Sequence, residues 1–356
     1  MLATLTTSSV DVISTVNLPP TNHHGWPWES SIERKAPLHA SDLPRITVVT
    51  PSYNQGDFLE QTIRSVLLQD YPNLQYIVVD GGSTDQSHAI LDKYNEHLSV
   101  VIREPDKGQS DAIAKGLALA DGEFFNWINS DDLLMPGTLW ELASRCRPKV
   151  DLYTFSVEVF GDDVKSYLMH NHNLSATAML RADRYSFSQP GLWFRTKYIQ
   201  DCGGIDRNLN YGFDWDLLVR YLADNPNVHY STSVGARFRL HAESKTVVEF
   251  AKQDEAANRF LQESERIRDK LEASLGTSLA NASRLGRLRV PWNDWLVEKL
   301  DDRDSSPVVA ASTIGWRAIK QPHVTFTWRT AGTILRLLSR YVRPKSSIGQ
   351  RNTPRH

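Results

Sequence analysis

The sequence has little cysteine, almost no net charge and no long hydrophobic run, and each shortage argues against a class of protein. Its two cysteines, Cys146 and Cys202, lie far apart without metal-ligand spacing, so we expect reduced thiols in a cytoplasmic protein. The formal net charge of −2 across 356 residues argues against a nucleic-acid partner.

Signals that would direct the chain to or across a membrane are also missing from the sequence. Residues 1–16 contain no basic segment followed by a long apolar core, so we expect no signal peptide. No stretch reaches the roughly 20 apolar residues that a membrane-spanning helix needs. The length suffices for one large domain with additions and a proper core.

Four apolar runs alternate with helical patterns in the first half of the chain. They lie at residues 46–50, 76–79, 98–102 and 124–128, and the segments between them show apolar residues at helical spacing. Such alternation predicts an α/β fold with a parallel sheet. In a sheet of this kind, ligands bind beyond the carboxyl ends of the strands.

Polar residues follow each of the four predicted strands. Asp131 and Asp132 come directly after the fourth strand, and adjacent carboxylates suit a hard divalent cation that is shared with substrate phosphates. The alternative is that both acids cap the next helix. The repeated placement of polar groups at strand ends favours a ligand site. The four loops contain residues 51–54, 80–85, 106–111 and 129–132.

Four segments resemble family 2 glycosyltransferases, in the order in which that family has them. These segments are TPSYN at residues 50–54, VDGGSTD at 79–85, GQSDA at 108–112 and WINSDD at 127–132. The resemblance covers roughly residues 45–245. It implies the GT-A fold, a mainly parallel α/β sheet flanked by helices, and transfer of a sugar from a nucleotide sugar with inversion of configuration.

The resemblance also implies a donor site along these loops. Pro51 and Tyr53 would line the base pocket, and Asp80 would accept hydrogen bonds from a uracil-like imide, so a UDP or dTDP sugar is expected. Asp111 with Lys107 would hold the ribose and the phosphates. The remaining residues implied to bind the nucleotide sugar are Asn54, Asp85, Asn129 and Ser130.

A divalent metal ion, Mn²⁺ or Mg²⁺, is a further implication of the resemblance. Asp131 occupies the last position of the family's Asp-X-Asp motif and would coordinate the ion that bridges the diphosphate, with Asp132 as its companion. The sequence departs from the motif at Asn129, where the first Asp often stands. Asparagine keeps one acceptor oxygen but loses the charge, which puts tight metal binding in doubt.

His241 stands where some GT-A enzymes carry a late histidine that touches the metal or the diphosphate. Arg239 and Lys245 lie nearby as candidate phosphate partners. A lone histidine is more often an ordinary surface or hydrogen-bonded residue, so both interpretations of His241 stay open.

A predicted helix that begins near Asp214 would supply the catalytic base. Similar family members place their base in an Asp-X-Asp-Leu stretch, and Asp214 matches that position, while Asp216 would orient or replace it. Phe213 stands where the family often has Glu. Inversion requires one base that takes the proton of the acceptor hydroxyl. The alternative is an acidic first turn that interacts with the helix dipole.

The end of the chain is predicted to be helical and basic. Residues 249–273 carry many charges of both signs and predict an exposed helix that links domains. After Asp304 no acidic residue occurs, whereas Lys and Arg continue. Within residues 325–356 an apolar stripe at helical spacing predicts an amphipathic helix that lies on an anionic membrane or packs on the protein.

The sequence therefore predicts an irregular lead-in at residues 1–44, a GT-A domain at 45–245 and a basic helical extension at 246–356. We expect an inverting, metal-dependent transferase that acts on a hydroxyl of a glycan or lipid-linked acceptor in cell-surface polysaccharide synthesis, peripheral to the inner face of the plasma membrane. The alternatives are a catalytically weak sugar-nucleotide-binding or scaffold protein and a nucleotidyltransferase. The latter usually has a Gly-rich basic loop after its first strand, which residues 51–56 lack.

Overall fold

The computed structural model describes residues 18, 22–29, 43–162, 164–181, 187–242, 244, 255–301, 306–320, 325 and 327–342. The chain forms two compact units, one of residues 1–179 and 186–275, the other of residues 180–185 and 276–356. Each unit has its own hydrophobic core. Helix α9 (Glu255–Ser274) groups with the first unit, and a domain boundary at residue 245 stays a prediction.

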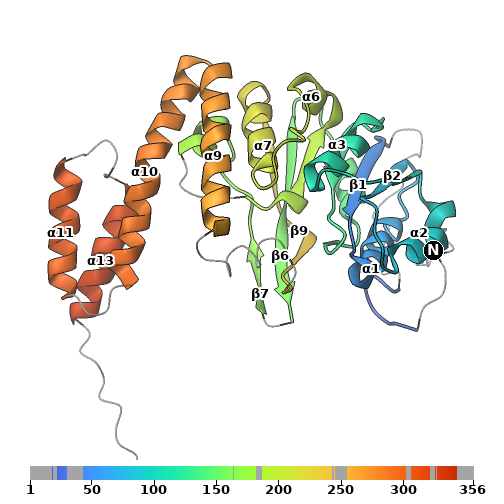
Figure 1. The fold of residues 1–356 in the computed structure, drawn as a ribbon, viewed down its shortest axis with the longest axis horizontal. Helices are drawn as coiled ribbons and strands as arrows, with labels where there is room; N and C mark the ends of the chain where they lie inside the picture. The colour runs from blue at the N-terminus through green and yellow to red at the C-terminus, as the bar shows by residue number, and fades with distance from the viewer. Residues whose placement is uncertain are drawn as a thin grey trace, which may run out of the picture. The chain divides into compact units, whose positions relative to one another are not determined.

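Nine strands among the described residues form one sheet in the first unit (Figure 1). Their order is β3-β2-β1-β4-β8-β6-β9-β5, with β7 paired to β6. The strands are β1 (Ile46–Ser52), β2 (Leu74–Asp80), β3 (Val100–Arg103), β4 (Phe124–Trp127), β5 (Leu133–Leu134), β6 (Leu152–Gly161), β7 (Val164–Met169), β8 (Leu192–Arg195) and β9 (Val228–Arg239).

The first four strands pair in parallel, in the order β3-β2-β1-β4. Three helices make the crossovers between them: α1 (Gly56–Leu67), α2 (Ser87–Tyr94) and α3 (Gln109–Ala118). Every residue of β1 is buried, as β-branched runs are when both faces of a parallel sheet are covered. The predicted α/β fold with flanking helices and a helical C-terminal region is confirmed.

The second half of the sheet is mixed, so the prediction of a mainly parallel sheet describes only the first half. Strand β8 is antiparallel to both β4 and β6, β6 is parallel to β9, and β5 is antiparallel to β9. Strands β6 and β7 follow each other directly in the chain and pair antiparallel. A short connection permits only this direction, because a parallel neighbour needs a crossover.

Helix α3 and the turn that follows it pack very closely on the sheet, and one glycine in each allows this approach. A Cβ atom at Gly116 would lie 2.6 Å from Cγ1 of Val49, and one at Gly122 would lie 2.6 Å from the backbone nitrogen of Thr47. Because both neighbours belong to β1, the position of α3 over the sheet is tightly fixed. The amino end of α3 therefore lies firmly beside the carboxyl ends of the strands.

The remaining helices of the first unit flank the second half of the sheet. They are α4 (Thr138–Arg145), α5 (Ala176–Arg181), α6 (Thr196–Asp201), α7 (Phe213–Asp224) and α9, with a short 3-10 helix at Gln189–Gly191. Another short 3-10 helix, Asn95–His97, follows α2 in the first half. Helices α7 and α9 lie side by side (Figure 1).

One face of α9 is buried, so the prediction of an exposed linking helix over residues 249–273 is wrong for the described part of this segment. Glu263, Ile267, Arg268 and Leu271 are at most 6 % exposed. Residues at this spacing share one face of a helix, and here that face packs on the first unit instead of facing water.

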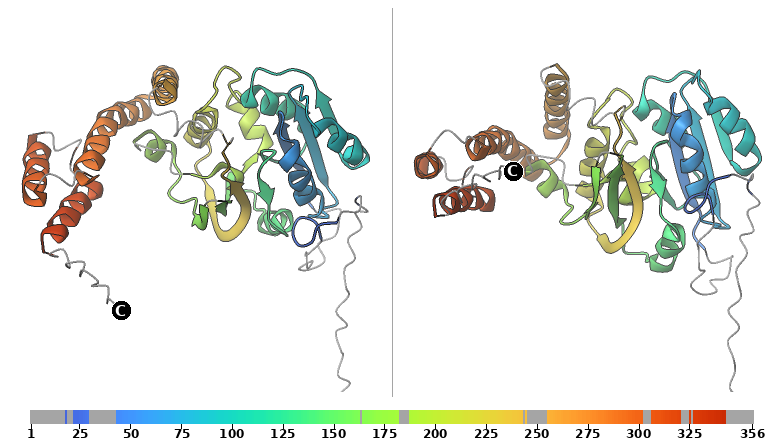
Figure 2. Two further views of the ribbon diagram at one scale, coloured as in Figure 1. Left: turned by 60° about the horizontal axis from the view of Figure 1, so that its bottom comes forward. Right: turned by 90° about the horizontal axis from the view of Figure 1, so that it is seen from below.

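The second unit consists of three described helices, α10 (Thr277–Asp301), α11 (Pro307–Lys320) and α13 (Trp328–Val342), which Figure 2 shows packed together. Its core includes Trp292, Leu296, Ile314 and Leu337. None of the helices in the described part of the chain is long and apolar enough to cross a bilayer.

Candidate functional site

The loops after β1 and β2 are tied together by Asn54. Its backbone N–H donates to Oγ of Ser83 at 2.8 Å, and its side-chain Oδ1 accepts from the backbone N–H of Thr84 at 2.8 Å. Asn54 has φ of 52°, a left-handed conformation that asparagine tolerates better than most residues. The predicted donor residue Asn54 thus joins two of the predicted loops.

Asp85, another predicted donor residue, binds the amino end of α1. Its Oδ2 accepts from the backbone N–H of Gly56 at 2.8 Å, and its Oδ1 accepts from that of Ser87 at 3.0 Å. Partial burial alone would raise the pKa of Asp85, but these hydrogen bonds lower the pKa below its usual value. The side chain therefore caps a helix whose own N-cap, Gln55, makes no side-chain capping bond.

Asp80 ends β2 and is fully buried. Its carboxylate accepts hydrogen bonds from the hydroxyl and the backbone N–H of Ser83 and lies 3.2 Å from Nε2 of His88. In this structure its oxygens are thus turned toward their own loop. Pro51 is buried in β1, and Tyr53 is 60 % exposed in the loop that follows.

Asp111 lies in the first turn of α3 and is 5 % exposed. Its Oδ2 accepts from the backbone N–H of Lys107 at 3.2 Å, and its Oδ1 lies 3.4 Å from a guanidinium nitrogen of Arg207. Arg207 is a cation that the sequence analysis missed. It belongs to the loop before α7, so the first and second halves of the domain meet at Asp111.

Asn129, where the family motif is altered, links the loop after β4 to the start of α3 through its side-chain amide. Its Oδ1 accepts from Nε2 of Gln109 at 2.7 Å, and its Nδ2 donates to Oδ2 of Asp132 at 3.0 Å. An aspartate at this position would place a second carboxylate 3.0 Å from that of Asp132. The departure from the motif therefore has a structural reason here, because the amide stabilises a buried neighbouring acid.

Asp132 is fully buried and faces the protein. Its Oδ1 accepts from the backbone N–H of Arg239 at 2.9 Å. Burial, and secondarily the charge of Asp131, raises the pKa of Asp132 well above its usual value. Ser130 beside it is 5 % exposed, and its carbonyl accepts from the hydroxyl of Thr62 at 2.8 Å.

Asp131 and His241 come together, although 110 residues separate them. Oδ2 of Asp131 lies 3.0 Å from Nε2 of His241, and the two side chains are 20 % and 13 % exposed. The imidazole ring packs against Phe58 at a centroid distance of 4.6 Å. Nε of Arg239 donates to the carbonyl of Asp131 at 2.9 Å. The structure thus assembles two predicted metal ligands, whereas Asp132 points away from them.

The spacing of the Asp131–His241 pair fits a divalent cation. Ligand bonds of about 2.1 Å place neighbouring ligands of an octahedral ion about 3.0 Å apart. No group of three or more His, Cys, Asp or Glu side chains suited to hold a metal occurs among the described residues. Two protein ligands suffice where substrate phosphates and water complete the coordination, as is usual for Mg²⁺.

The two acids at the start of α7 differ in their surroundings. Asp214 is half-buried in the first turn, and its Oδ1 accepts from the backbone N–H of Trp215 at 2.7 Å. Asp216 is fully buried and accepts from the guanidinium of Arg220 at 2.5 and 2.9 Å. Arg220 also donates to the carbonyls of Cys202 and Gly204. Asp214 is thus the more accessible acid of the two.

A third acid near α7, Glu263 of α9, was missed by the sequence analysis. It is 3 % exposed and accepts three backbone hydrogen bonds from residues 210–212, directly before α7. No local pattern points to it, because more than fifty residues separate the partners. Within the charged segment 249–273 it looks like any solvated glutamate.

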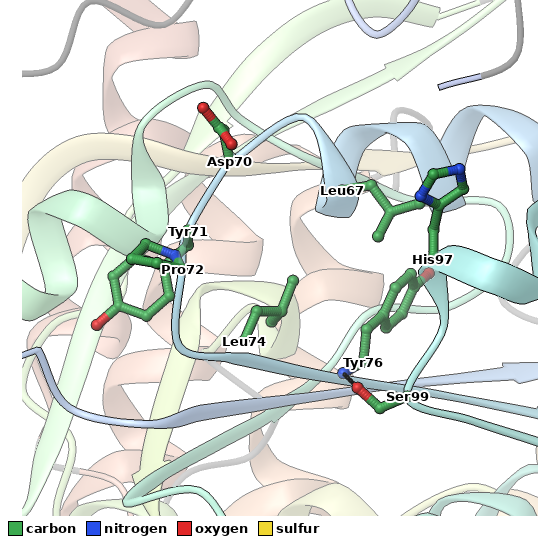
Figure 3. Close-up of a pocket in the computed structure, with 8 residues that line it drawn as sticks. All are labelled: Leu67, Asp70, Tyr71, Pro72, Leu74, Tyr76, His97 and Ser99. Carbon is green, nitrogen blue, oxygen red and sulfur yellow. Dashed lines mark hydrogen bonds between the residues drawn. The ribbon is translucent and has the colours of Figure 1, made fainter. Parts of the chain in front are cut away.

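A cavity of about 240 Å³ lies at the opposite edge of the sheet (Figure 3). It is lined by Leu67, Asp70, Tyr71, Pro72, Leu74, Tyr76, His97 and Ser99. Leu74 begins β2 and Ser99 precedes β3, so the cavity faces the amino ends of the strands. It contains none of the predicted site residues.

A parallel half-sheet with polar loops at its carboxyl ends, continued by a mixed half-sheet with an acidic helix start, defines the GT-A class of sugar-nucleotide transferase folds. Residues 47–208 match the model of glycosyl transferase family 2. This match confirms the resemblance to the family.

Relatives and solved structures agree with this assignment. TuaG of Bacillus subtilis, named provisionally as a teichuronic acid biosynthesis glycosyltransferase, is 40 % identical over 92 residues, which are 25 % of this chain and 36 % of TuaG. An uncharacterized glycosyltransferase of Rickettsia typhi is 31 % identical over 213 residues, 56 % of this chain and 64 % of the relative. The chain thus spans about one third to two thirds of these relatives' lengths.

Among solved structures, a mannosyltransferase of Pyrobaculum calidifontis in complex with GDP-Man and Mn²⁺ has a similar fold. The TM-score is 0.51 at 18 % identity, and the match covers 84 % of this chain and 87 % of the mannosyltransferase. At this identity the likeness concerns the fold.

Proposed function

We propose that this protein is an inverting glycosyltransferase that transfers a sugar from a nucleotide-diphosphate sugar to a hydroxyl group. One observation carries the proposal: Asp131, after β4, and His241, after β9, lie 3.0 Å apart, and α7 presents Asp214 at its start. The domain thus offers groups for the two functions that inversion requires, leaving-group stabilisation and proton removal.

The donor would lie along the carboxyl ends of β1 to β4. Pro51, Tyr53 and Asp80 would form the base pocket, which favours a UDP or dTDP sugar, and Asp111 with Lys107 would hold the ribose and phosphates. Asn54, Asp85, Asn129 and Ser130 shape these loops through the hydrogen bonds described above.

Asp131 and His241 would hold a manganese or magnesium ion, which offsets the charge of the departing diphosphate. Asp132 was also predicted as a ligand. The burial of Asp132 and its hydrogen bonds to Asn129 and Arg239 support a role in orienting the loop of residues 129–132.

Asp214 would take the proton of the attacking acceptor hydroxyl. Its half-buried position leaves it more accessible to a substrate than Asp216, which is fully buried and forms an ion pair with Arg220. We assign Asp216 the orienting role, because its ion pair ties α7 to the carbonyls of Cys202 and Gly204. No covalent intermediate is needed, since inversion proceeds by one displacement.

The acceptor would be a glycan or lipid-linked glycan of a cell-surface polysaccharide. The teichuronic acid assignment of TuaG supports this setting. The proposal concerns the chemistry of one transfer step, in which a hydroxyl replaces the nucleoside diphosphate at the anomeric carbon.

Thermal shift with a panel of UDP, dTDP and GDP sugars, with and without Mn²⁺, tests the donor class. We expect one nucleotide sugar to raise the melting temperature in the presence of metal and to be hydrolysed slowly. Stabilisation without any turnover would favour the sugar-nucleotide-binding or scaffold alternative. If no nucleotide diphosphate stabilises the protein with metal present, the transferase proposal is wrong.

We further propose that the second unit contacts an anionic membrane. Membrane contact was predicted for residues 325–356, and the surface of α11 gives the proposal further support. One face of α11 buries Ala310, Ile314 and Ala318 in the core of the unit. The opposite face is also apolar: Val308, Val309, Trp316 and Ile319 are 40 to 71 % exposed. These four side chains share one side of the helix.

Charge indicates what would cover this α11 face. Lys320 Nζ lies 3.7 Å from the centre of the Trp316 ring, and Arg317 stacks at 4.4 Å over the ring of Trp295. Residues 305–356 contain no acid. On α13, Leu335 and Leu338 are exposed as well. Apolar side chains flanked by cations suit the interface of a bilayer with anionic headgroups.

Vesicle co-sedimentation tests this contact with the full chain. The double variant W316E/I319E should reduce binding to phosphatidylglycerol-containing vesicles by about tenfold or more, because two apolar side chains lose their burial. Leu119→Glu, which changes a 46 % exposed leucine of the transferase unit, is the matched control. Equal binding of variant and wild type, or equal binding to neutral phosphatidylcholine vesicles, would overturn the proposal.

A further inference from the structure

The carboxylate of Glu263 holds the segment that leads into α7. Its Oε2 accepts from the backbone N–H of Asn210 at 2.8 Å. Its Oε1 accepts from the backbone N–H groups of Tyr211 at 2.6 Å and Gly212 at 2.8 Å. Three successive backbone donors thus converge on one carboxylate that is 3 % exposed.

Helix α7 has no side-chain capping bond from its N-cap residue, and a distant acid binds the N–H of that residue and of the two residues before it. Its N-cap is Gly212, which has no side chain to accept the free N–H groups of a helix start. Consecutive N–H groups form a concave anion site, and a negative charge near a helix amino end is favoured by the helix dipole. Glu263 supplies that charge from 51 residues further along the chain.

Two more side chains of α9, Arg268 and Lys270, contact the segment that leads into α7. We call residues 206–216 the base loop. Lys270 Nζ lies 2.7 Å from Oδ2 of Asp206 and 3.4 Å from Oδ1 of Asp216, near the two ends of the base loop. The guanidinium of Arg268 stacks over the ring of Trp215 at 5.0 Å. Helix α9 therefore contacts the base loop along its length.

The base loop also contacts the donor side of the domain. The hydroxyl of Ser110 donates to the carbonyl of Leu209 at 2.6 Å, and Arg207 lies 3.4 Å from Asp111. The base loop is consequently held by α3 as well as by α9. Any shift of α9 would change where the first turn of α7 lies relative to the amino end of α3.

We propose that Glu263 is a positioning residue that fixes Asp214 for proton removal, and that α9 is a working part of the transferase unit. This inference rests on the proposed role of Asp214 as the base. A misplacement of about 1 Å can cost on the order of a hundredfold in rate, because the acceptor oxygen must lie in hydrogen-bond reach of the base. Donor binding depends on other loops and should persist.

Glu263→Gln is the variant that tests the positioning role. It keeps the size of the side chain but turns an amide NH₂ toward backbone donors, so at least one hydrogen bond is lost. We expect kcat for the nucleotide sugar that the wild type turns over fastest to fall about 10- to 100-fold, with KM for that donor unchanged within about twofold. Glu265→Gln, an exposed glutamate of the same helix, is the control and should keep wild-type kcat.

Hydrogen exchange provides a readout that does not depend on turnover. The amides of residues 210–212 should lose protection in Glu263→Gln and keep it in Glu265→Gln. Unchanged protection would overturn the contact itself, and lost protection with unchanged kcat would overturn the positioning role. A wild type that turns over no nucleotide sugar, with the exchange difference present, would refute the proposed function and not the contact.

Lys270→Gln is a second variant that tests the role of α9 even if Glu263→Gln fails to fold. Lys270 is 43 % exposed, so its replacement should leave the melting temperature almost unchanged. We expect a smaller loss of kcat, about two- to fivefold, with donor KM again unchanged. Wild-type kcat in a folded Lys270→Gln protein, together with wild-type exchange at residues 210–212, would contradict the proposed role of α9.

Discussion

The loops at the carboxyl ends of β1 to β4 and the base loop are held in different ways. Several contacts of the former join neighbouring loops through amide and backbone groups, as do those of Asn54 with Thr84 and of Asn129 with Gln109. The base loop is held by charged side chains of α7 and α9, among them Arg220 and Glu263. The donor side thus combines contacts between nearby segments with the long-range pair of Asp131 and His241, whereas the base loop is held by charged groups of α7 and α9.

Because of this difference, the donor side and the base side should tolerate different substitutions. Loss of one amide contact among the first four loops leaves other neutral contacts in place. Loss of the charge of Asp216 or of Arg220 leaves its buried partner unpaired, which costs several kcal/mol. Substitutions on the base side should therefore affect either catalysis or stability strongly, depending on which acid is changed.

The largest effect is expected for Asp214→Asn, which removes the proposed base. We expect kcat to fall about 10²- to 10⁴-fold, because general base catalysis contributes this much. Donor affinity, measured by calorimetry with the nucleotide sugar, should stay within about twofold. Equal losses of transfer and of donor binding would place Asp214 on the donor side instead.

Asp216→Asn should act on stability. It leaves Arg220 without its buried carboxylate, and breaking such a pair costs about 3–5 kcal/mol in free energy of unfolding. Chemical denaturation measures this loss, and the folded fraction should lose less kcat than Asp214→Asn does. A stable Asp216→Asn protein without activity would instead make Asp216 the base.

His241→Ala should weaken the donor side. If Asp131 and His241 share an ion, its loss should reduce metal-dependent donor affinity about 10- to 100-fold, while the melting temperature of the ligand-free protein changes little. Titration with Mn²⁺ at fixed donor concentration measures this effect. Loss of stability with unchanged metal dependence would show that the histidine serves only as a hydrogen-bonded packing residue against Phe58.

The smallest effect concerns the ion pair between Lys270 and Asp206. Burial alone would raise the pKa of Asp206, but the hydrogen bond from Lys270 and those from Asn208 lower the pKa below its usual value. The pair therefore contributes stability above the unfolded pKa of about 3.9 and loses it as the pH falls through the lower folded pKa.

Lys270→Gln should consequently lose at most about 1 kcal/mol of unfolding free energy at pH 7, since the lysine is partly exposed and screened by solvent. The difference from wild type should shrink as the pH falls below about 4. Urea denaturation across this range measures it. A difference that stays constant with pH would mean that the ion pair with Asp206 is not its source.

The strands and the polar loops of the first half could be predicted because their signals are local. β-Branched runs such as residues 46–50 end in polar clusters, and the parallel order follows from the helices between them. The resemblance implied Asp131 and His241 as two separate candidate metal ligands, and the structure brings them together.

The mixed half of the sheet and the role of Glu263 could not be predicted from the sequence. Strand β6 pairs with β7, β8 and β9, and no local pattern selects among these partners. The difference between Asp214 and Asp216 likewise depends on Arg220 and on burial, which the spacing of two acids in one turn does not reveal.

Helix α9 also sets a limit for recombining this protein with its relatives. A chimera designed on the family match would exchange residues 47–208, cut the base loop and separate Asp206 from its partner Lys270. Even an exchange that included all of α7 would leave the new Gly212 N–H without its carboxylate. Crossovers placed after Leu275 would transfer α7 together with Glu263. Only such exchanges should transfer acceptor specificity with full turnover.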